Sequence, residues 1–226
     1  MSKDRIAAFA AAASVGSSRV SKFASVLVAA SLALAIFTGS AAALAADPED
    51  SVRNLYETLL RTMKEGRILG ESGRFARIEP VINRLFDIPF MARLAVGTSW
   101  ASLSPAQQQQ VTAAFGSYIS ATYADRFDSY AGQRLEVSGH QPSASGVIVK
   151  TRIVKGSGEA VSIEYLMRQN GDDWRISDVY LDGSISQLAT QRSEFGAIMR
   201  RDGFDGLIAT LNQKVSLLTG NVAKAS

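Results

Sequence analysis

The sequence contains no cysteine. This absence excludes disulfide bonds, zinc–thiolate sites, iron–sulfur clusters and thiol catalysis. It also excludes a membrane anchor built on a lipid-modified N-terminal cysteine. Any binding or catalytic chemistry must therefore come from other side chains.

Histidine is nearly absent as well, because His140 is the only one in 226 residues. A catalytic triad would need His140 to meet a serine and an acid through the tertiary fold, and no serine lies in a Gly-x-Ser-x-Gly sequence. A single histidine without cysteine leaves only carboxylates as metal ligands, so we expect no metal site. Lys155-Gly156-Ser157-Gly158 resembles a phosphate loop, but it lies between two expected strands and a hairpin turn explains it. The sequence thus predicts neither catalytic residues nor a cofactor.

The net positive charge is confined to the start of the chain. The formal charge of +3 comes from the first 22 residues, which hold four of the 24 basic and one of the 21 acidic residues. From Asp47 onward there are 20 basic and 20 acidic residues. A balanced chain without a basic stripe argues against nucleic acid as a partner.

An uncharged segment of 24 residues, from Phe23 to Ala46, follows the basic start. It ends in small residues that include Ala43-Leu44-Ala45. A basic start, an apolar stretch and an Ala-x-Ala site are typical of a secretory signal peptide, which we expect over residues 1–46 with cleavage after Ala45 or Ala46. An uncleaved anchor is the alternative, since such a segment can span a bilayer. Export predicts a periplasmic protein with one domain, residues 47–226.

Helix signals dominate the first and last parts of the remaining chain. Asp47-Pro48 combines a capping acid with proline at the first helical position, and Ser104-Pro105 repeats the signal. Apolar residues at helical spacing then predict four helices over about 48–69, 74–86, 88–96 and 105–130. Two further helices are expected after Asp182, with a boundary at Asp202–Asp205.

Between these helical regions the period of the apolar pattern changes from 3.6 to 2. Four strands are expected at 134–139, 146–154, 160–169 and 173–181. Short turn sequences such as Asn170-Gly171 make them antiparallel neighbours with one apolar face. The predicted fold class is α+β: a helical N-terminal layer, a four-stranded antiparallel β-meander and C-terminal helices.

Large aromatic residues are numerous, with ten phenylalanines, six tyrosines and two tryptophans. Packing in an ordinary hydrophobic core would account for these aromatic side chains. A curved sheet covered by long helices can also leave an apolar cavity that is open at one end. The pattern of apolar residues alone does not decide between these two arrangements.

Several short segments, in a fixed order along the chain, carry a family resemblance. They are Asp87-Ile88-Pro89-Phe90-Met91-Ala92, Val96-Gly97-x-x-Trp100, Leu103-Ser104-x-x-Gln107-Gln108, Tyr123-x-x-x-Phe127-x-x-Tyr130, Trp174-Arg175-Ile176-x-Asp178-Val179, and Ala189-x-x-Arg192-x-Glu194-Phe195. In this set the chain resembles the MlaC or toluene-tolerance family of periplasmic phospholipid-binding carriers. It resembles in particular the hopanoid-associated branch, HpnM.

The resemblance implies a soluble lipid-transport protein that helps to maintain the outer membrane. Its fold would be an NTF2- or cystatin-like cup that encloses an apolar lipid pocket. Its ligand would be a phospholipid or a hopanoid, and it would need no cofactor. Its partners would be an inner-membrane lipid transporter and an outer-membrane lipid-transfer complex, contacted transiently by a monomer.

Inward-facing apolar residues are the candidate lipid-binding residues. The candidates on the sheet are Val149, Ile163, Tyr165 and Met167. The candidates on the helices are Phe90, Leu94, Phe115, Ile119, Tyr123 and Phe195. Ordinary core packing would explain each of these residues equally well.

Two other functions stay open at this point. A small cup can host acid–base catalysis on a hydrophobic substrate, which needs a buried carboxylic acid inside the cup. Asp178, within an apolar strand, is the only candidate for that role. A purely structural adaptor of a membrane transport complex is the third possibility, and it would have a filled core.

Overall fold

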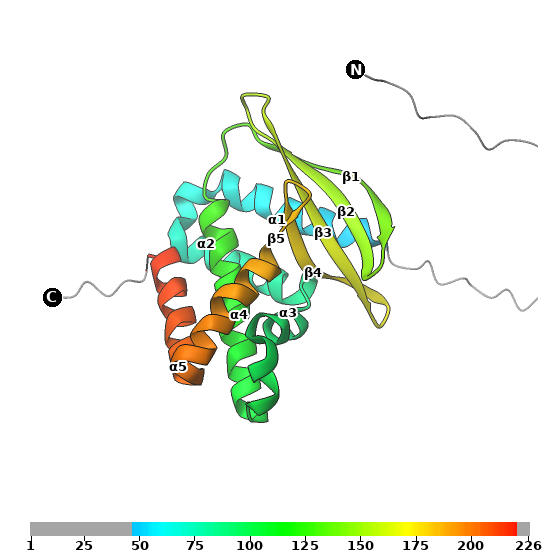
Figure 1. Ribbon diagram of the computed structural model, residues 1–226. Coiled ribbons are helices and arrows are strands. Elements are labelled where there is room, and N and C mark those ends of the chain that lie inside the picture. The colour runs from blue at the N-terminus through cyan, green and yellow to red at the C-terminus, as the bar shows by residue number, and fades with distance from the viewer. Residues whose placement is uncertain (1–46, 221–226) are drawn as a thin grey trace, which may run out of the picture. The chain divides into compact units, whose positions relative to one another are not determined.

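Helices precede and follow one antiparallel sheet in the computed structural model, which describes residues 47–220 (Figure 1). The predicted signal peptide, residues 1–46, lies outside the described residues. Within residues 47–220, no helix combines the length and the hydropathy needed to cross a bilayer. The α+β class, with a β-meander between helical regions, is confirmed.

Four helical elements form the first part of the chain. They are α1 (Pro48–Lys64), α2 (Gly66–Leu85), α3 (Ile88–Val96) and the 3-10 helix η1 (Gly97–Ser102). The carboxylate of Asp47 caps α1 as expected, accepting a hydrogen bond from the backbone N–H of Glu49 at 2.9 Å. The first helix breaks at Glu65 rather than near residue 69, and Gly70, with a φ of 62°, instead kinks α2.

The long helix α4 (Pro105–Arg126) starts where the sequence predicts and ends earlier. Ser104 and Gln107 form a capping box, in which each side chain accepts a hydrogen bond from the other residue's backbone N–H. The helix was expected to continue to about Tyr130, but Phe127 already leaves the helical conformation. Residues 127–133 therefore reach the sheet as a loop.

The sheet has the strand order β1-β2-β3-β4-β5, with antiparallel neighbours throughout. The strands are β1 (Arg134–Ser143), β2 (Gly146–Val154), β3 (Ala160–Asn170), β4 (Asp173–Leu181) and the two-residue β5 (Ile185–Ser186). The four long strands agree with the prediction, and β5 is an addition. β1 passes through Pro142, where a turn was expected; an edge strand tolerates proline because its outer side needs no ladder partner.

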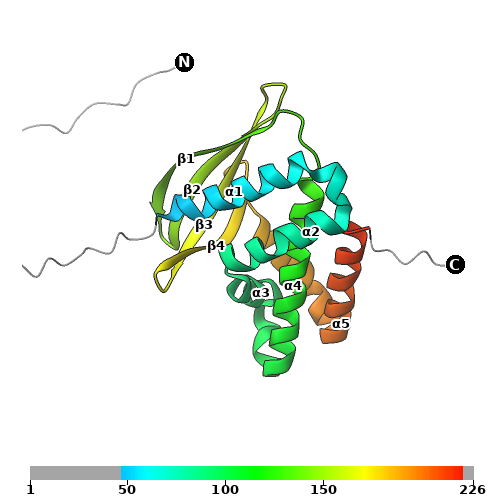
Figure 2. The ribbon, with the colours of Figure 1, turned by 180° about the vertical axis from the view of Figure 1, so that it is seen from behind.

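The last helix, α5 (Gln187–Leu218), is one kinked element where two helices were expected. The kink falls at Gly203, which has a φ of 70°, inside the predicted boundary. α4 and α5 pack side by side, and α1 lies across the inner face of the sheet (Figure 2).

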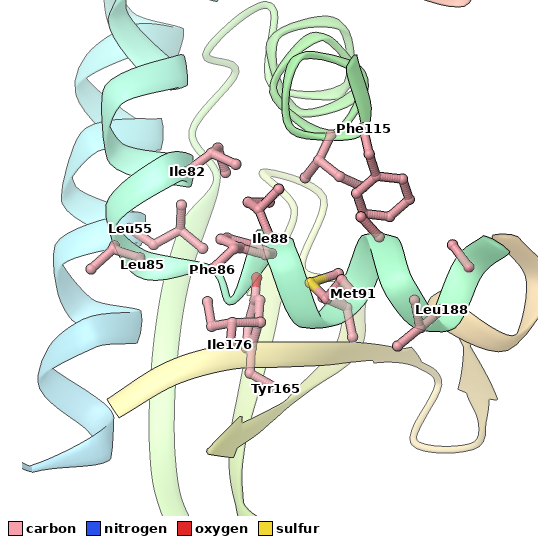
Figure 3. Packing of buried hydrophobic residues seen from close by; sticks show 14 of the residues in the cluster. Leu55, Ile82, Leu85, Phe86, Ile88, Met91, Phe115, Tyr165, Ile176 and Leu188 are labelled. Atoms are coloured by element: carbon pink, nitrogen blue, oxygen red, sulfur yellow. The ribbon is translucent and has the colours of Figure 1, made fainter. Parts of the chain in front are cut away.

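The core lies between this inner face and the helices. Figure 3 shows Phe86, Met91 and Ile176 packed where α2 and α3 meet β4. The backbone N–H of Asp87 donates to the carbonyl oxygen of Ile176 at 2.8 Å, so the junction of α2 and α3 is held directly against the sheet. This anchoring covers one end of the inner face, and the side chains of Phe86 and Met91 reach from there to the wall of a cavity.

Candidate functional site

A partly open cavity of about 360 Å³ remains at the other end of the inner face. Its apolar lining comes from both the helices and the sheet: Met63, Phe86, Met91, Ile119, Tyr123, Phe127, Leu135, Ile153, Ile163, Tyr165, Val179 and Leu181. Its polar lining is Thr122, Arg126, Asp128, Ser129, Gln133, Lys155, Gln187 and Gln191. A mostly apolar wall with a few polar groups suits an apolar ligand, or the apolar part of a larger one.

Strand pairing places the sheet side of the cavity on one surface. Leu135 of β1 pairs with Ile153 of β2, and Ile163 of β3 pairs with Leu181 of β4. Side chains alternate between the two faces of a strand, so paired residues point to the same side. Each long strand thus contributes to the wall.

Helical spacing builds the opposite wall. Ile119, Tyr123 and Arg126 follow one another along a single face of α4. Gln187 and Gln191, four residues apart, present a polar edge from the first turns of α5. The helix wall therefore carries Ile119 and Tyr123 with the polar Thr122 and Arg126 on α4, and two amides on α5.

The loop 127–133 forms part of the rim of the cavity, together with Lys155, which directly follows β2. The Phe127 ring stacks on Tyr123, with centroids 5.7 Å apart and an interplanar angle of 13°. Lys155 pairs with Glu159 at 2.9 Å. The rim thus carries charge of both signs around an aromatic stack.

Close contacts with α2 fix the position of this rim. Arg74 donates from Nε to the carbonyl oxygen of Ala124 at 3.0 Å, near the end of α4. Gly66 lies so close to the loop that an added Cβ would collide with the carbonyl oxygen of Asp128. Glycine at position 66 therefore allows the loop to sit where it lines the cavity.

Buried hydroxyl groups lie where the cavity meets the core. The hydroxyl of Thr151 donates to the carbonyl oxygen of Ile163 at 2.5 Å, and the hydroxyl of Tyr56 lies 2.5 Å from Thr151 Oγ1. The ring of Tyr165 meets that of Tyr56 edge-on, at a centroid distance of 5.9 Å. Burial raises the pKa of both tyrosines above the ordinary value of 10. This side of the cavity is therefore uncharged at neutral pH.

Four of the ten residues predicted as lipid-binding line the cavity: Ile119, Tyr123, Ile163 and Tyr165. Four others, Val149, Phe115, Met167 and Phe195, are buried in the packed core and do not line it. The Phe195 ring meets the Phe115 ring edge-on at 6.2 Å, an arrangement that fills space. Whether any of the ten contacts lipid stays a prediction.

The remaining two, Phe90 and Leu94, border a separate pocket of about 380 Å³ with Leu166 and Leu188. The guanidinium carbon of Arg168 lies 3.8 Å from the centroid of the Phe90 ring. The structure therefore does not bring these two residues together with the other candidates.

The polar lining residues were missed because the sequence search selected apolar side chains. Thr122 lies three residues after Ile119 on α4, so helical spacing alone could have placed it on the same side of the helix. Gln187 and Gln191 carry no such signal, because their inward direction depends on how α5 packs against α4.

Asp178, the candidate catalytic acid, lies outside the set of cavity-lining residues. Its carboxylate accepts hydrogen bonds from the backbone N–H of Val179 at 2.7 Å and of Leu188 at 3.0 Å. It also accepts one from the hydroxyl of Ser186 at 2.6 Å. Asp178 therefore anchors the start of α5, and it borders the separate pocket beside Phe90 and Leu94 rather than this cavity.

One group of potential metal ligands occurs within residues 47–220: Asp47, Glu49 and His140. Each member already has a protein partner. Asp47 caps α1, and Glu49 accepts from Arg53 and lies 2.9 Å from His140 Nδ1. Capping and ion pairing account for this cluster.

Comparison with known proteins agrees with this architecture. In the solved structure of the phospholipid-binding protein from Ralstonia solanacearum, determined in complex with a phospholipid, the fold is similar, with a TM-score of 0.64. The two chains are 23% identical over 76% of this chain and 99% of that one. The MlaC protein family matches residues 53–213, from α1 through most of α5. Because this match spans the helices, the whole sheet and the cavity, the chain belongs to the MlaC family.

Proposed function

We propose that this protein is a periplasmic carrier that shelters the tails of one lipid in the cavity between α4, α5 and the sheet. The observation that carries the proposal is the cavity itself, which is apolar where the four long strands line it and polar at its rim. A lipid has the same division into tails and headgroup. The membership of the chain in the MlaC family, and the phospholipid in the Ralstonia protein, support the proposal.

The physical basis is removal of tails from water. Each methylene taken out of water contributes about 0.8 kcal/mol, so a sheltered tail is held without any polar contact. The rim carries Arg126, Lys155 and Asp128, which can face a solvated headgroup. Selectivity would then come from the shape of the cavity and from its few polar groups.

The proposed role is lipid movement between the two membranes. The signal peptide expected at residues 1–46 supports a periplasmic location. The proposed partners are an inner-membrane lipid transporter and an outer-membrane lipid-transfer complex. In a direct test, the lipid-loaded protein should transfer labelled lipid between vesicles prepared from inner and outer membranes, and no transfer above a protein-free control would contradict the carrier role.

The binding step is tested by what copurifies. The full chain, expressed with its own leader in a Gram-negative host and purified gently, should release a stoichiometric lipid on denaturation, as measured by mass spectrometry. Ile153→Trp should fill the cavity and lower lipid occupancy severalfold. Lys150→Trp is the matched control, because Lys150 lies on the same strand but is exposed.

Two outcomes would count against the carrier. One is wild-type protein without any bound lipid. The other is equal occupancy in Ile153→Trp and Lys150→Trp, which would place the lipid elsewhere.

The identity of the lipid follows from the same experiment. We propose a phospholipid or a hopanoid as the ligand. In a host that makes both phospholipids and hopanoids, the protein can bind either class. The lipid extracted from the purified protein then shows which class it binds. A fused-ring hopanoid in the cavity would support the HpnM branch, whereas exclusively phospholipid would argue against it.

A further inference from the structure

Exposed apolar side chains gather around the mouth of the cavity. Within residues 47–220, four large apolar residues are exposed: Ile68, Tyr130, Ile185 and Leu217. Tyr130 belongs to the loop 127–133 that forms part of the rim. Ile185 of β5 pairs with Leu181 of β4, which lines the cavity. Isolated exposed apolar side chains are ordinary, but several around one opening are typical of a docking surface.

Ile68 is the most exposed of the four, at 90%. It follows the junction of α1 and α2, two residues after Gly66, where an added Cβ would meet the carbonyl oxygen of Asp128 in the rim loop. The ammonium group of Lys64, just before the junction, lies 5.4 Å from the centroid of the Tyr130 ring. Figures 1 and 2 both show the junction beside the segment that leads from α4 into β1. The junction and the rim loop therefore form one continuous surface at the mouth.

Three exposed basic residues accompany Ile68 at this junction: Arg61, Lys64 and Arg67. Within residues 47–220, none of the three forms an ion pair with a carboxylate. Glu65, the only acid between positions 61 and 68, already pairs with Arg77 at 2.7 Å. The junction thus combines a protruding isoleucine with uncompensated positive charge. We call Ile68, Tyr130 and these three basic residues the rim patch.

The excess of positive charge is specific to this part of the mouth. On α4 and the rim loop, Arg126 is accompanied by the exposed Asp125 and Asp128, so no positive excess arises there. Beside Ile185, Asp182 precedes β5 and the carboxylate of Glu164 approaches Gly183. An anionic partner is therefore met by the α1–α2 junction rather than by the β5 side.

We propose that the rim patch docks this protein on the surface of an anionic phospholipid bilayer. The inference rests on the proposed carrier function and adds the place where the carrier meets the membrane. Ile68 enters the boundary between headgroups and tails, while the basic side chains stay at the level of the headgroups. The mouth of the cavity then borders the leaflet, so a lipid tail enters it over a short path.

A bilayer fits the rim patch better than a folded partner protein does. A stable protein interface buries about 800 Å² on each partner and needs complementary shapes. A fluid lipid surface needs no such complementarity, so one protruding isoleucine among basic residues is sufficient for weak, reversible docking. Reversibility is what a carrier requires, because it has to leave the membrane with its lipid.

The first test is sedimentation of the protein with vesicles. The full chain, exported with its own leader and purified, is mixed with vesicles of phosphatidylglycerol and phosphatidylcholine or of phosphatidylcholine alone. Ile68→Ser should lower the affinity for the mixed vesicles about tenfold, and Ile68→Leu should retain it. Arg67→Gln should lower the affinity for the mixed vesicles about fivefold and leave that for phosphatidylcholine unchanged.

Arg200→Gln is the matched control for the charge. Arg200 is also exposed, and it lies on α5 outside the lining of the lipid cavity. Within the described residues it has no carboxylate partner either. Its substitution should leave vesicle binding unchanged. All variants carry the same terminal segments and should share one thermal unfolding midpoint, since the altered side chains are exposed.

A second test reports contact with the bilayer directly. Because the sequence has no cysteine, an introduced cysteine carries an environment-sensitive dye at one position. The dye on Ile68→Cys should shift its emission to shorter wavelength when mixed vesicles are added. The dye on Gln110→Cys should not, because Gln110 is exposed near the start of α4, whereas the other end of α4 borders the cavity.

The outcomes separate docking from lipid binding. Wild-type protein that holds lipid but does not bind mixed vesicles would overturn the proposal, favour a protein partner and leave the carrier function intact. Unchanged binding of Ile68→Ser, or an equal loss in Arg67→Gln and Arg200→Gln, would also overturn it. Wild-type protein without any copurified lipid would instead refute the proposed function.

Discussion

The inner face of the sheet has a packed end and a hollow end, although the same strands build both. At the packed end, Val149, Met167 and Ile176 are fully buried. At the hollow end, Leu135 and Ile153 are only partly buried and face the cavity. The strands carry inward-facing apolar residues at both ends, although the pairing register shifts between Val137 and His140 and between Leu166 and Met167. The layer that covers the inner face therefore determines whether that face is filled.

The covering layer differs between the two ends. α1 and α3 contact the sheet directly, and the hydrogen bond from Asp87 to Ile176 clamps the packed end. The hollow end is bordered by the loop 127–133, because α4 stops at Arg126. Another helical turn would have carried Phe127 and Tyr130 onwards in the direction of α4. The early end of α4 thus accompanies the change from a packed core to the cavity of about 360 Å³.

The same substitution at the two ends should give the largest contrast in stability. Phe195→Ala removes a fully buried ring that packs against two aromatic neighbours, and should lower the free energy of unfolding by about 3–5 kcal/mol. Phe127→Ala, at the hollow end, should cost less than about 2 kcal/mol, since the ring already borders open space. Urea denaturation of the delipidated variants measures both values. Equal losses would mean that the two ends are packed alike.

A smaller effect is expected where α2 supports the rim. Gly66→Ala introduces a methyl group against the carbonyl oxygen of Asp128 and should cost about 1–3 kcal/mol as the loop is displaced. Gly73→Ala is the control on the same helix. Its added methyl meets only the side chain of Leu69, so the change should stay below about 1 kcal/mol. A neutral Gly66→Ala would show that the rim is not held by this contact.

These contacts also explain which features the sequence could predict. Capping at Asp47 and Ser104, and alternation along the strands, are local, so the helix starts and the apolar face were predicted correctly. The end of α4 was not predicted correctly, because apolar residues continue at helical spacing through Phe127. The bond from Arg74 to Ala124 joins residues 50 apart in the sequence, and no local pattern carries it. The cavity depends on such distant contacts, as does the inward direction of Gln191.

Raising the pH should lower the free energy of unfolding, because buried tyrosines lie between the two ends. Burial raises the pKa of Tyr56 and Tyr165 above 10 in the folded protein. Above about pH 10 the unfolded chain loses these protons while the folded protein keeps them, so unfolding becomes more favourable as pH rises. The expected slope is at most about 1.4 kcal/mol per pH unit for each buried tyrosine.

Denaturation midpoints between pH 8.5 and 11 measure this slope, and tyrosinate absorbance reports ionisation. Tyr165→Phe should flatten the pH dependence. Tyr130→Phe, which alters an exposed side chain, should leave it unchanged. A slope that neither variant changes would assign the alkaline sensitivity to other groups.

The smallest expected effect comes from deleting one methylene at each end. Ile176→Val opens a new void in a filled region and should cost about 1 kcal/mol. Ile153→Val only enlarges an existing space, so in the delipidated protein it should cost less than about 0.5 kcal/mol. Bound lipid should remove this difference in stability cost, because a tail in contact with Ile153 fills the space beside its side chain. The cost of Ile153→Val should therefore rise towards that of Ile176→Val when the unfolding of lipid-loaded protein is measured. If it stays unchanged by loading, the tails do not reach the β2 wall.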